Sequence, residues 1–92
     1  MTPPAVMTFA AMTQLTLYGK PGCCLCDDAR AEVEAVRAER PFELEEVDVS
    51  IDPRLWRDYG ERIPVLEIDG EEAFELHVDR VELARRLDTV RS

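Results

Sequence analysis

The feature that most restricts the fold of this chain is the position of its cysteines. All three of them, Cys23, Cys24 and Cys26, lie within four consecutive positions of "LYGKPGCCLCDDAR". The preceding "LTLY" is a β-prone run that stops at Gly19, and "KPG" then turns the chain into a run of good helix formers. The cysteines are therefore predicted between the end of a strand and the first turn of a helix, where backbone N–H groups lack partners.

Periodicity along the rest of the chain predicts further helices and strands. The first helix should run from about Cys24 to Glu39, because apolar residues recur there at helical spacing. The expected later elements are a strand over 42–49, a short helix over 53–59, a hairpin with strands 65–68 and 73–76, and a helix after 79. The order β-α-β-α-β-β-α predicts an α/β fold, with a four-stranded mixed sheet flanked by helices.

Several local features refine this prediction. Asp52 is expected to cap the short helix, whose first position is Pro53, and Asp79 with Glu82 should form a capping pair for the last helix.

Aromatic and apolar positions predict which helix faces are buried. Trp56 and Tyr59 of the short helix are expected in the core. The residues expected on or beside the buried face of the last helix are Val81, Leu83, Ala84 and Leu87.

Charge and hydropathy exclude two classes of protein. With a formal net charge of −9 and no cluster of Lys and Arg, the chain is not expected to bind nucleic acid. No apolar run approaches the roughly 20 residues of a membrane-spanning helix, and the N-terminus lacks the pattern of a secretory signal. We therefore expect a cytoplasmic monomer with a poorly ordered extension over 1–13 and one folded domain over 14–92.

The spacing of two cysteines suits disulfide chemistry. Cys23 and Cys26 stand three positions apart at the start of the helix, so that their side chains share a face and can form a bridge. The unpaired N–H groups and Lys20 should stabilise a thiolate at Cys23. Asp27 and Asp28 oppose this effect, but we expect the closer N–H groups to outweigh these solvent-screened carboxylates.

Two other interpretations of the cysteines remain open. Cys24 does not face either neighbour, and it is either a small residue at a permissive position or an accessory redox thiol. A structural zinc site needs four ligands, usually in two separated pairs, whereas here a lone His77 lies far from the cysteines. We expect His77 to be exposed at a strand end and predict neither a bound metal nor a resident cofactor.

Two segments carry a resemblance to a known family. "LYGKPGCCLC" resembles the active-site segment of glutaredoxins, and "RIPVLEIDG" is similar to the cis-proline segment of thioredoxin-fold proteins. The resemblance covers about residues 14–87 and implies a thioredoxin-like fold. It implies that Cys23 is the nucleophile, that Cys26 is the resolving thiol, and that the Ile63–Pro64 bond is cis. The substrate-binding residues that it implies are Lys20, Ile63, Pro64 and Val65.

The chain departs from ordinary glutaredoxins in two ways. Cys24 replaces the usual proline between the cysteines, and the glycine pair that follows the hairpin in glutaredoxins has no counterpart. Bulky and acidic residues are expected in that region instead, namely Glu71, Glu72, Phe74 and Glu75. Since glutathione is anionic, we expect it to be a poor partner, although Lys20 argues in its favour.

Three functions compete at this stage. The first is a thiol–disulfide oxidoreductase of a short glutaredoxin-like type, acting on a protein dithiol or disulfide. The second is a redox-responsive binding module without turnover, and the third is carriage of a metal or cluster by the cysteines.

Overall fold

The computed structural model describes residues 13–91, with side chains described through residue 88. The predicted extension over 1–13 lies outside these residues apart from Thr13, which is buried. The Thr13 carbonyl accepts a hydrogen bond from the Glu43 N–H at 2.9 Å, so the chain is already tied to the sheet at this position.

The order of elements confirms the predicted α/β fold. The elements are β1 (Gln14–Gly19), α2 (Cys24–Arg37), β2 (Glu43–Asp48), a 3₁₀ turn (Val49–Ile51), α3 (Pro53–Tyr59), β3 (Val65–Ile68), β4 (Glu71–Glu75) and α4 (Arg80–Arg91). The four strands form one mixed sheet in the order β2-β1-β3-β4, in which β1 pairs parallel with β2 and the other pairs are antiparallel. None of the helices in the described part of the chain is long and apolar enough to cross a membrane.

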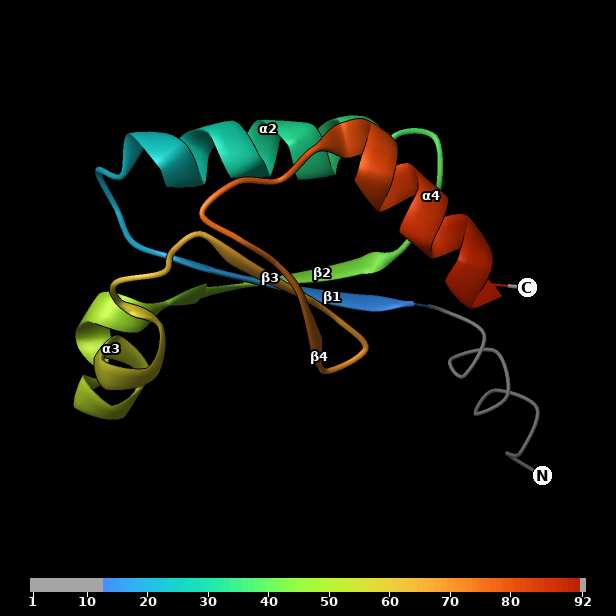
Figure 1. Cartoon of the computed structure of the whole chain (residues 1–92). Coiled ribbons are helices and arrows are strands. Elements are labelled where there is room, and N and C mark those ends of the chain that lie inside the picture. The colour runs from blue at the N-terminus through green and yellow to red at the C-terminus, as the bar shows by residue number, and fades with distance from the viewer. Residues whose placement is uncertain (1–12, 92) are drawn as a thin grey trace, which may run out of the picture.

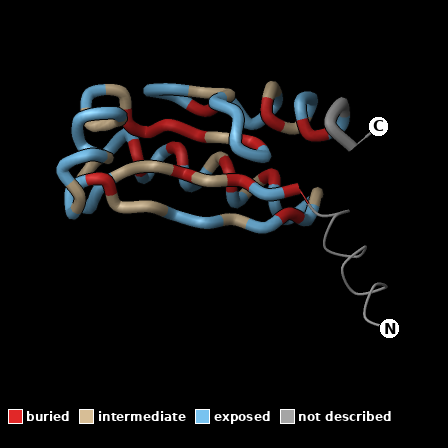
Figure 2. Tube along the Cα trace, turned by 90° about the horizontal axis from the view of Figure 1, so that it is seen from below, coloured by how far each residue is buried: buried red, intermediate tan, exposed pale blue. Residues whose placement is uncertain are grey.

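The helices cover both sides of the sheet. Figure 1 shows α2 and α4 together above the strands, whereas α3 lies below them at the end where α2 begins. Buried residues, red in Figure 2, recur along the strands and along α2 and α4, because these helices pack on the sheet. The buried residues of the main core are Leu15, Leu17, Ala29, Val33, Val36, Phe42, Leu66, Ile68, Val78, Leu83 and Leu87.

The turn and cap predictions are mostly confirmed. Asp69 and Gly70 have φ values of 53° and 87°, the pattern of the predicted Asp-Gly hairpin turn. Asp52 caps α3 by accepting from the Arg54 N–H at 2.8 Å, with Pro53 at the first helical position.

The start of α4 differs from the prediction. Asp79 accepts from the Val81 N–H at 3.2 Å, but Glu82 pairs with Arg85 at 2.6 Å instead of completing a capping pair. Glu32 of α2 supplies the second cap, because its Oε1 accepts from the Arg80 N–H at 3.2 Å. This contact joins the two helices above the sheet.

Two predicted core residues are exposed. Val81 is 71% exposed, whereas Leu83 and Leu87 are buried, because Val81 stands two positions before Leu83 and so lies on the opposite side of α4. Trp56 is 44% exposed, because α3 lies at the rim of the sheet and buries only part of its apolar face.

Candidate functional site

The cysteines and the predicted cis-proline lie at one edge of the sheet. The parallel strands β1 and β2 end at this edge, and the antiparallel strand β3 begins there. The Ile63–Pro64 bond is cis, and Ile63 packs in a small buried cluster with Cys26 and Val49, against which Cys23 also packs. The predicted proximity of the cysteines to the cis-proline is therefore confirmed.

Cys23 occupies the N-cap position of α2. Its Sγ accepts a hydrogen bond from the Cys26 N–H at 3.3 Å, as expected for a sulfur beside the free N–H groups of a helix start. Cys23 is half-buried, whereas Cys24 is exposed. Exposure alone would thus favour Cys24 as the accessible thiol, but the hydrogen bond from the start of the helix is made to Cys23.

Cys26 is the buried member of the pair, with 2% of its surface exposed. The pKa of the Cys26 thiol is raised to about 11. Burial is the main cause, and a hydrogen bond between the two thiol groups acts in the same direction. The Lys20 backbone and the Arg30 charge act in the opposite direction but do not cancel the effect of burial. Cys26 therefore stays protonated at neutral pH.

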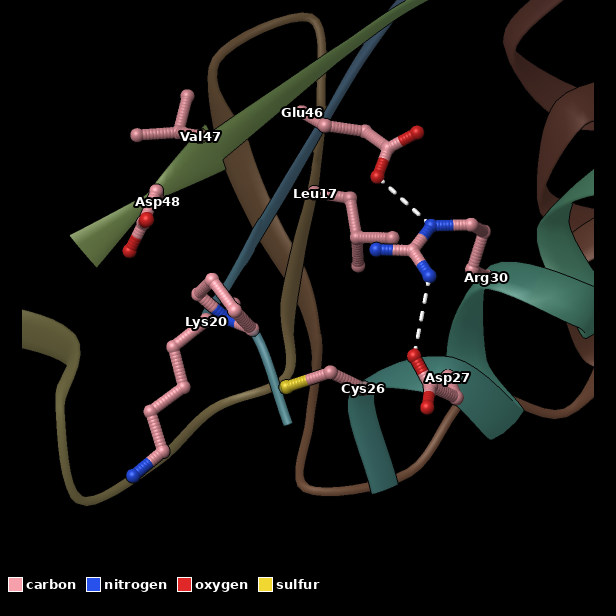
Figure 3. Close-up of a pocket in the computed structure, with 10 residues that line it drawn as sticks. Leu17, Lys20, Cys26, Asp27, Arg30, Glu46, Val47 and Asp48 are labelled. Atoms are coloured by element: carbon pink, nitrogen blue, oxygen red, sulfur yellow. Dashed lines mark hydrogen bonds and ion pairs between the residues drawn. The ribbon is translucent and has the colours of Figure 1, made fainter. Parts of the chain in front are cut away.

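A cavity of about 340 Å³ opens beside Cys26, and Figure 3 shows its lining. The Arg30 guanidinium lies between two carboxylates there, with Nε 2.7 Å from Glu46 and Nη1 3.1 Å from Asp27. The Cys26 sulfur points toward the loop between β1 and α2, whereas the Lys20 ammonium points away from it. Cys26 is therefore one of the residues that line this cavity, although only 2% of its surface is exposed.

Gly19 permits the close approach of Cys26 to the end of β1. A Cβ at this position would lie 3.0 Å from the Cys26 Sγ and 3.2 Å from its Cβ, which is closer than ordinary packing. The glycine that ends the strand therefore leaves room for the Cys26 side chain.

We expect Gly19→Ala to lower the free energy of unfolding by about 1–3 kcal/mol, because the added methyl group overpacks against Cys26. Alanine in a strand is otherwise favoured over glycine, so a loss would report this contact. Urea unfolding of the reduced protein measures the effect. In a Cys26→Ala background the same substitution should cost less by at least about 0.5 kcal/mol. An equal cost in both backgrounds would contradict the proposed contact.

The raised pKa of Cys26 predicts a loss of stability at high pH. The thiol stays protonated in the folded protein up to about pH 11 but ionises near pH 9 once the chain unfolds. Its contribution is complete below pH 9 and is lost as the pH rises toward 11. Between about pH 8 and 10.5, the reduced protein should lose about 2 kcal/mol more than Cys26→Ala does. Tyrosine ionisation contributes equally to the stability of both proteins, so it cancels in the comparison. If the unfolding free energies of the two proteins fall in parallel with pH, the assignment is wrong.

The Lys20 ammonium is engaged by an aromatic ring. Its Nζ lies 5.5 Å from the centroid of the Trp56 ring, a cation–π contact. Trp56 was expected in the core, but its ring instead lies beside Gly60, where an added Cβ would come within 2.6 Å of the ring. A ligand carboxylate that used Lys20 would have to compete with this contact.

The predicted substrate-binding residues and a stacked pair of tyrosines lie close to the cysteines. Ile63, Pro64 and Val65 are all buried, and of the three only Ile63 keeps a few per cent of its surface exposed. Tyr18 and Tyr59 stack with ring centroids 4.1 Å apart. Tyr59 is only partly buried and packs against the small buried cluster, so its predicted core position is confirmed only in part. Burial raises the pKa of both tyrosines, and both hydroxyl groups donate to Glu67.

The acidic residues of the hairpin are less close to the cysteines than expected. The register pairs Glu75 with Val65 at the cysteine edge but Glu71 with Ile68 three positions further along the sheet, roughly 10 Å away. Arg62 bonds both Glu72, at 2.6 Å, and Glu75, at 3.1 Å. The acids that were expected to repel glutathione are therefore partly distant and partly paired, and Phe74 packs against the core.

The sequence analysis missed three residues that shape the site. These are Arg30, Leu25 and Leu76. Leu76 has a φ of 68°, in the left-handed region that favours glycine, and no local pattern in "FELHVD" indicates this. His77 is exposed, as predicted. Within residues 13–91 no three His, Cys, Asp or Glu side chains converge as a metal site would require.

Comparisons with known proteins agree with this geometry. Residues 14–88 match the Glutaredoxin-like domain (DUF836) family. An uncharacterized protein of Mycobacterium tuberculosis is 30% identical over an alignment of 84 residues, and the alignment covers 86% of this chain and 84% of that one. A structural genomics target from X. campestris is 33% identical, with a TM-score of 0.71 over 82% of this chain and 96% of that one.

More distant structures share the fold. A thioredoxin variant from Halobacterium salinarum is 22% identical, with a TM-score of 0.67 over 100% of this chain and 86% of that one. At this level of identity the similarity concerns the fold alone. The family match, together with the cysteine pair beside a cis-proline, shows that this chain belongs to the glutaredoxin-like (DUF836) family of thioredoxin-fold proteins.

Proposed function

We propose that the protein is a dithiol–disulfide oxidoreductase in which Cys23 attacks and Cys26 resolves. The observation that carries this proposal is the asymmetry of the pair. The Cys23 sulfur is partly accessible and accepts an N–H hydrogen bond at the helix start, whereas Cys26 lies buried behind it with a raised pKa.

The first step is attack on a substrate disulfide. The Cys23 thiolate forms an S–S bond with one substrate sulfur, the substrate S–S bond breaks, and the other sulfur leaves as a thiolate that takes a proton from solvent. The N–H group of Cys26 holds the attacking sulfur in place and stabilises its charge before the attack.

The second step releases the substrate. The Cys26 thiol gives its proton to water in the adjoining cavity, and its sulfur then attacks the Cys23 sulfur. A Cys23–Cys26 bond forms, and the bound substrate sulfur leaves as a thiolate. The burial of Cys26 keeps it protonated until the mixed disulfide is present, which limits its reaction with other oxidants.

Closing the cycle requires a reductant, and we expect a protein dithiol to serve better than glutathione. Leu76 lies directly after the hairpin, where glutaredoxins keep a glycine pair, Lys20 is held over Trp56, and the net charge is −9. Reduction of the Cys23–Cys26 disulfide by a thioredoxin-type dithiol should be about tenfold more efficient than by glutathione, and the difference should shrink as salt is added. Stopped-flow rates at low and high ionic strength measure this. Fast, saturable reduction by glutathione would contradict it.

Turnover separates this proposal from a redox-responsive binding module. The reduced protein should catalyse reduction of a protein disulfide by excess dithiol, and the rate should be proportional to the protein concentration. A Cys23–Cys26 bridge that forms reversibly without accelerating this reaction would favour the binding module instead.

A further inference from the structure

The exposed apolar side chains point to a surface that the disulfide chemistry does not itself require. Among the described side chains, the exposed large hydrophobic residues are Leu25, Ile51, Trp56, Leu76 and Val81. Leu25 lies between Cys24 and Cys26, and Leu76 lies at the end of β4 that reaches the cysteine edge. Val81 belongs to α4, away from this edge.

Leu25 and Leu76 line the same groove. Its volume is about 270 Å³, and its other apolar lining residues are the exposed Ala31 and the largely buried Ala29 and Val78. Leu25 is 52% exposed and Leu76 is 47% exposed, so neither leucine is covered by the fold. In Figure 1 the chain that leads from β4 to α4 passes beside the first half of α2, which brings these segments together.

The groove residue Leu76 is bonded to the loop that carries the cis-proline. The Leu76 N–H donates to the Pro64 carbonyl at 2.7 Å and to the Arg62 carbonyl at 3.1 Å, the two residues that flank Ile63. Ile63 packs against Cys26 in the small buried cluster. A polypeptide whose cysteine reaches Cys23 would therefore pass the groove with a neighbouring residue.

Hydrogen bonds to the loop before β3 hold the backbone of Leu76 in an unusual conformation. A φ of 68° is unfavourable for a residue with a Cβ, and glycine would adopt it freely. Backbone strain of this kind persists where a site depends on it. Here the strained residue holds a half-exposed leucine toward the groove and gains only part of the burial that a core leucine would gain.

Charge at the rim indicates which polypeptides fit. Glu32 is bound by Arg80 at 3.0 Å, which leaves Asp28 as the rim carboxylate for which no ion pair is seen among the described residues. With a net charge of −9 behind it, this rim favours a cationic partner.

We propose that the Leu25–Leu76 groove binds an aliphatic side chain adjacent to the attacked cysteine of a polypeptide disulfide, and that Asp28 favours a basic residue nearby. The proposal rests on the proposed oxidoreductase function and names its substrate class. Glutathione carries no aliphatic side chain beside its cysteine and so cannot fill the groove.

Two synthetic peptides test the groove. Each carries one cysteine joined to thionitrobenzoate and one lysine, and they differ only in having leucine or serine on both sides of the cysteine. Attack by Cys23 forms the Cys23–peptide disulfide and releases thionitrobenzoate, the better leaving group, which is followed by its absorbance. Cys24→Ser is used as the background so that the exposed thiol does not contribute.

The leucine peptide should react about tenfold faster than the serine peptide, as expected for burying one aliphatic side chain. Leu25→Gln and Leu76→Asn should each reduce this ratio of the two rates to about two or less. Asparagine is chosen at Leu76 because it tolerates positive φ. Val81→Gln, which removes a more exposed apolar side chain elsewhere, should keep the full ratio.

Three results would overturn the proposal. One is an equal rate with both peptides, and another is a ratio that survives both groove substitutions. The third is a change of oligomeric state in sedimentation without a change of ratio, which would assign the groove to a second copy of the chain. Failure of Cys23 to release thionitrobenzoate from either peptide would overturn the proposed function itself, and the groove proposal with it.

Discussion

Replacing Cys23 with serine should lower the rate of disulfide reduction at least about 1000-fold. A serine hydroxyl is not ionised at neutral pH, and the hydrogen bond from the Cys26 N–H cannot compensate for the loss of a thiolate. The measurement is the turnover of a protein disulfide by the reduced variant, with a protein dithiol as the reductant.

The matched control is Cys24→Ser, which removes the neighbouring exposed thiol and should change the rate less than about threefold. Limited alkylation of the reduced protein followed by mass spectrometry should label Cys23 first. If Cys24→Ser is the inactive variant, or if Cys24 is the thiol that is labelled first, the assignment of the nucleophile is wrong.

Replacing Cys26 with serine should lower turnover about 100-fold or more and should trap the substrate on Cys23. The resolving attack by Cys26 is intramolecular, so its loss leaves only slower release by an external thiol. Serine is smaller than cysteine at the position that faces Gly19, so the fold should tolerate it.

Mass spectrometry of the Cys26→Ser protein after mixing with a protein disulfide should identify a mixed disulfide at Cys23. The wild-type protein under the same conditions should instead contain the Cys23–Cys26 bridge. Unchanged turnover without any trapped species would show that Cys26 takes no part in the cycle.

The fold was largely predictable from the sequence because its signals are local. The Asp-Gly turn, the Asp52–Pro53 helix start and the apolar spacing of α2 each depend on residues close together in the chain, and all three are present. Val81 and Trp56 were predicted incorrectly because helical spacing does not say how much of a helix face the sheet covers.

The site was predictable only in part. The Cys23–Cys26 spacing and the cis Pro64 come from short motifs, whereas the contacts of Arg30 and Leu76 depend on segments far apart in the sequence. Arg30 pairs with Glu46, sixteen positions away, on a neighbouring strand. The φ of Leu76 is set by hydrogen bonds to the loop before β3, which its own neighbours in sequence do not reveal.

The most direct test of the central claim is a redox titration of the three thiols. The protein is equilibrated with dithiothreitol buffers of defined potential, free thiols are alkylated, and each cysteine is quantified by mass spectrometry. The proposed mechanism predicts that Cys23 and Cys26 become protected from alkylation together, in one reversible two-electron transition. Cys24 should remain a free thiol and be alkylated at every potential. Oxidation that pairs Cys24 instead, or that joins two chains while Cys26 stays reduced, would contradict it.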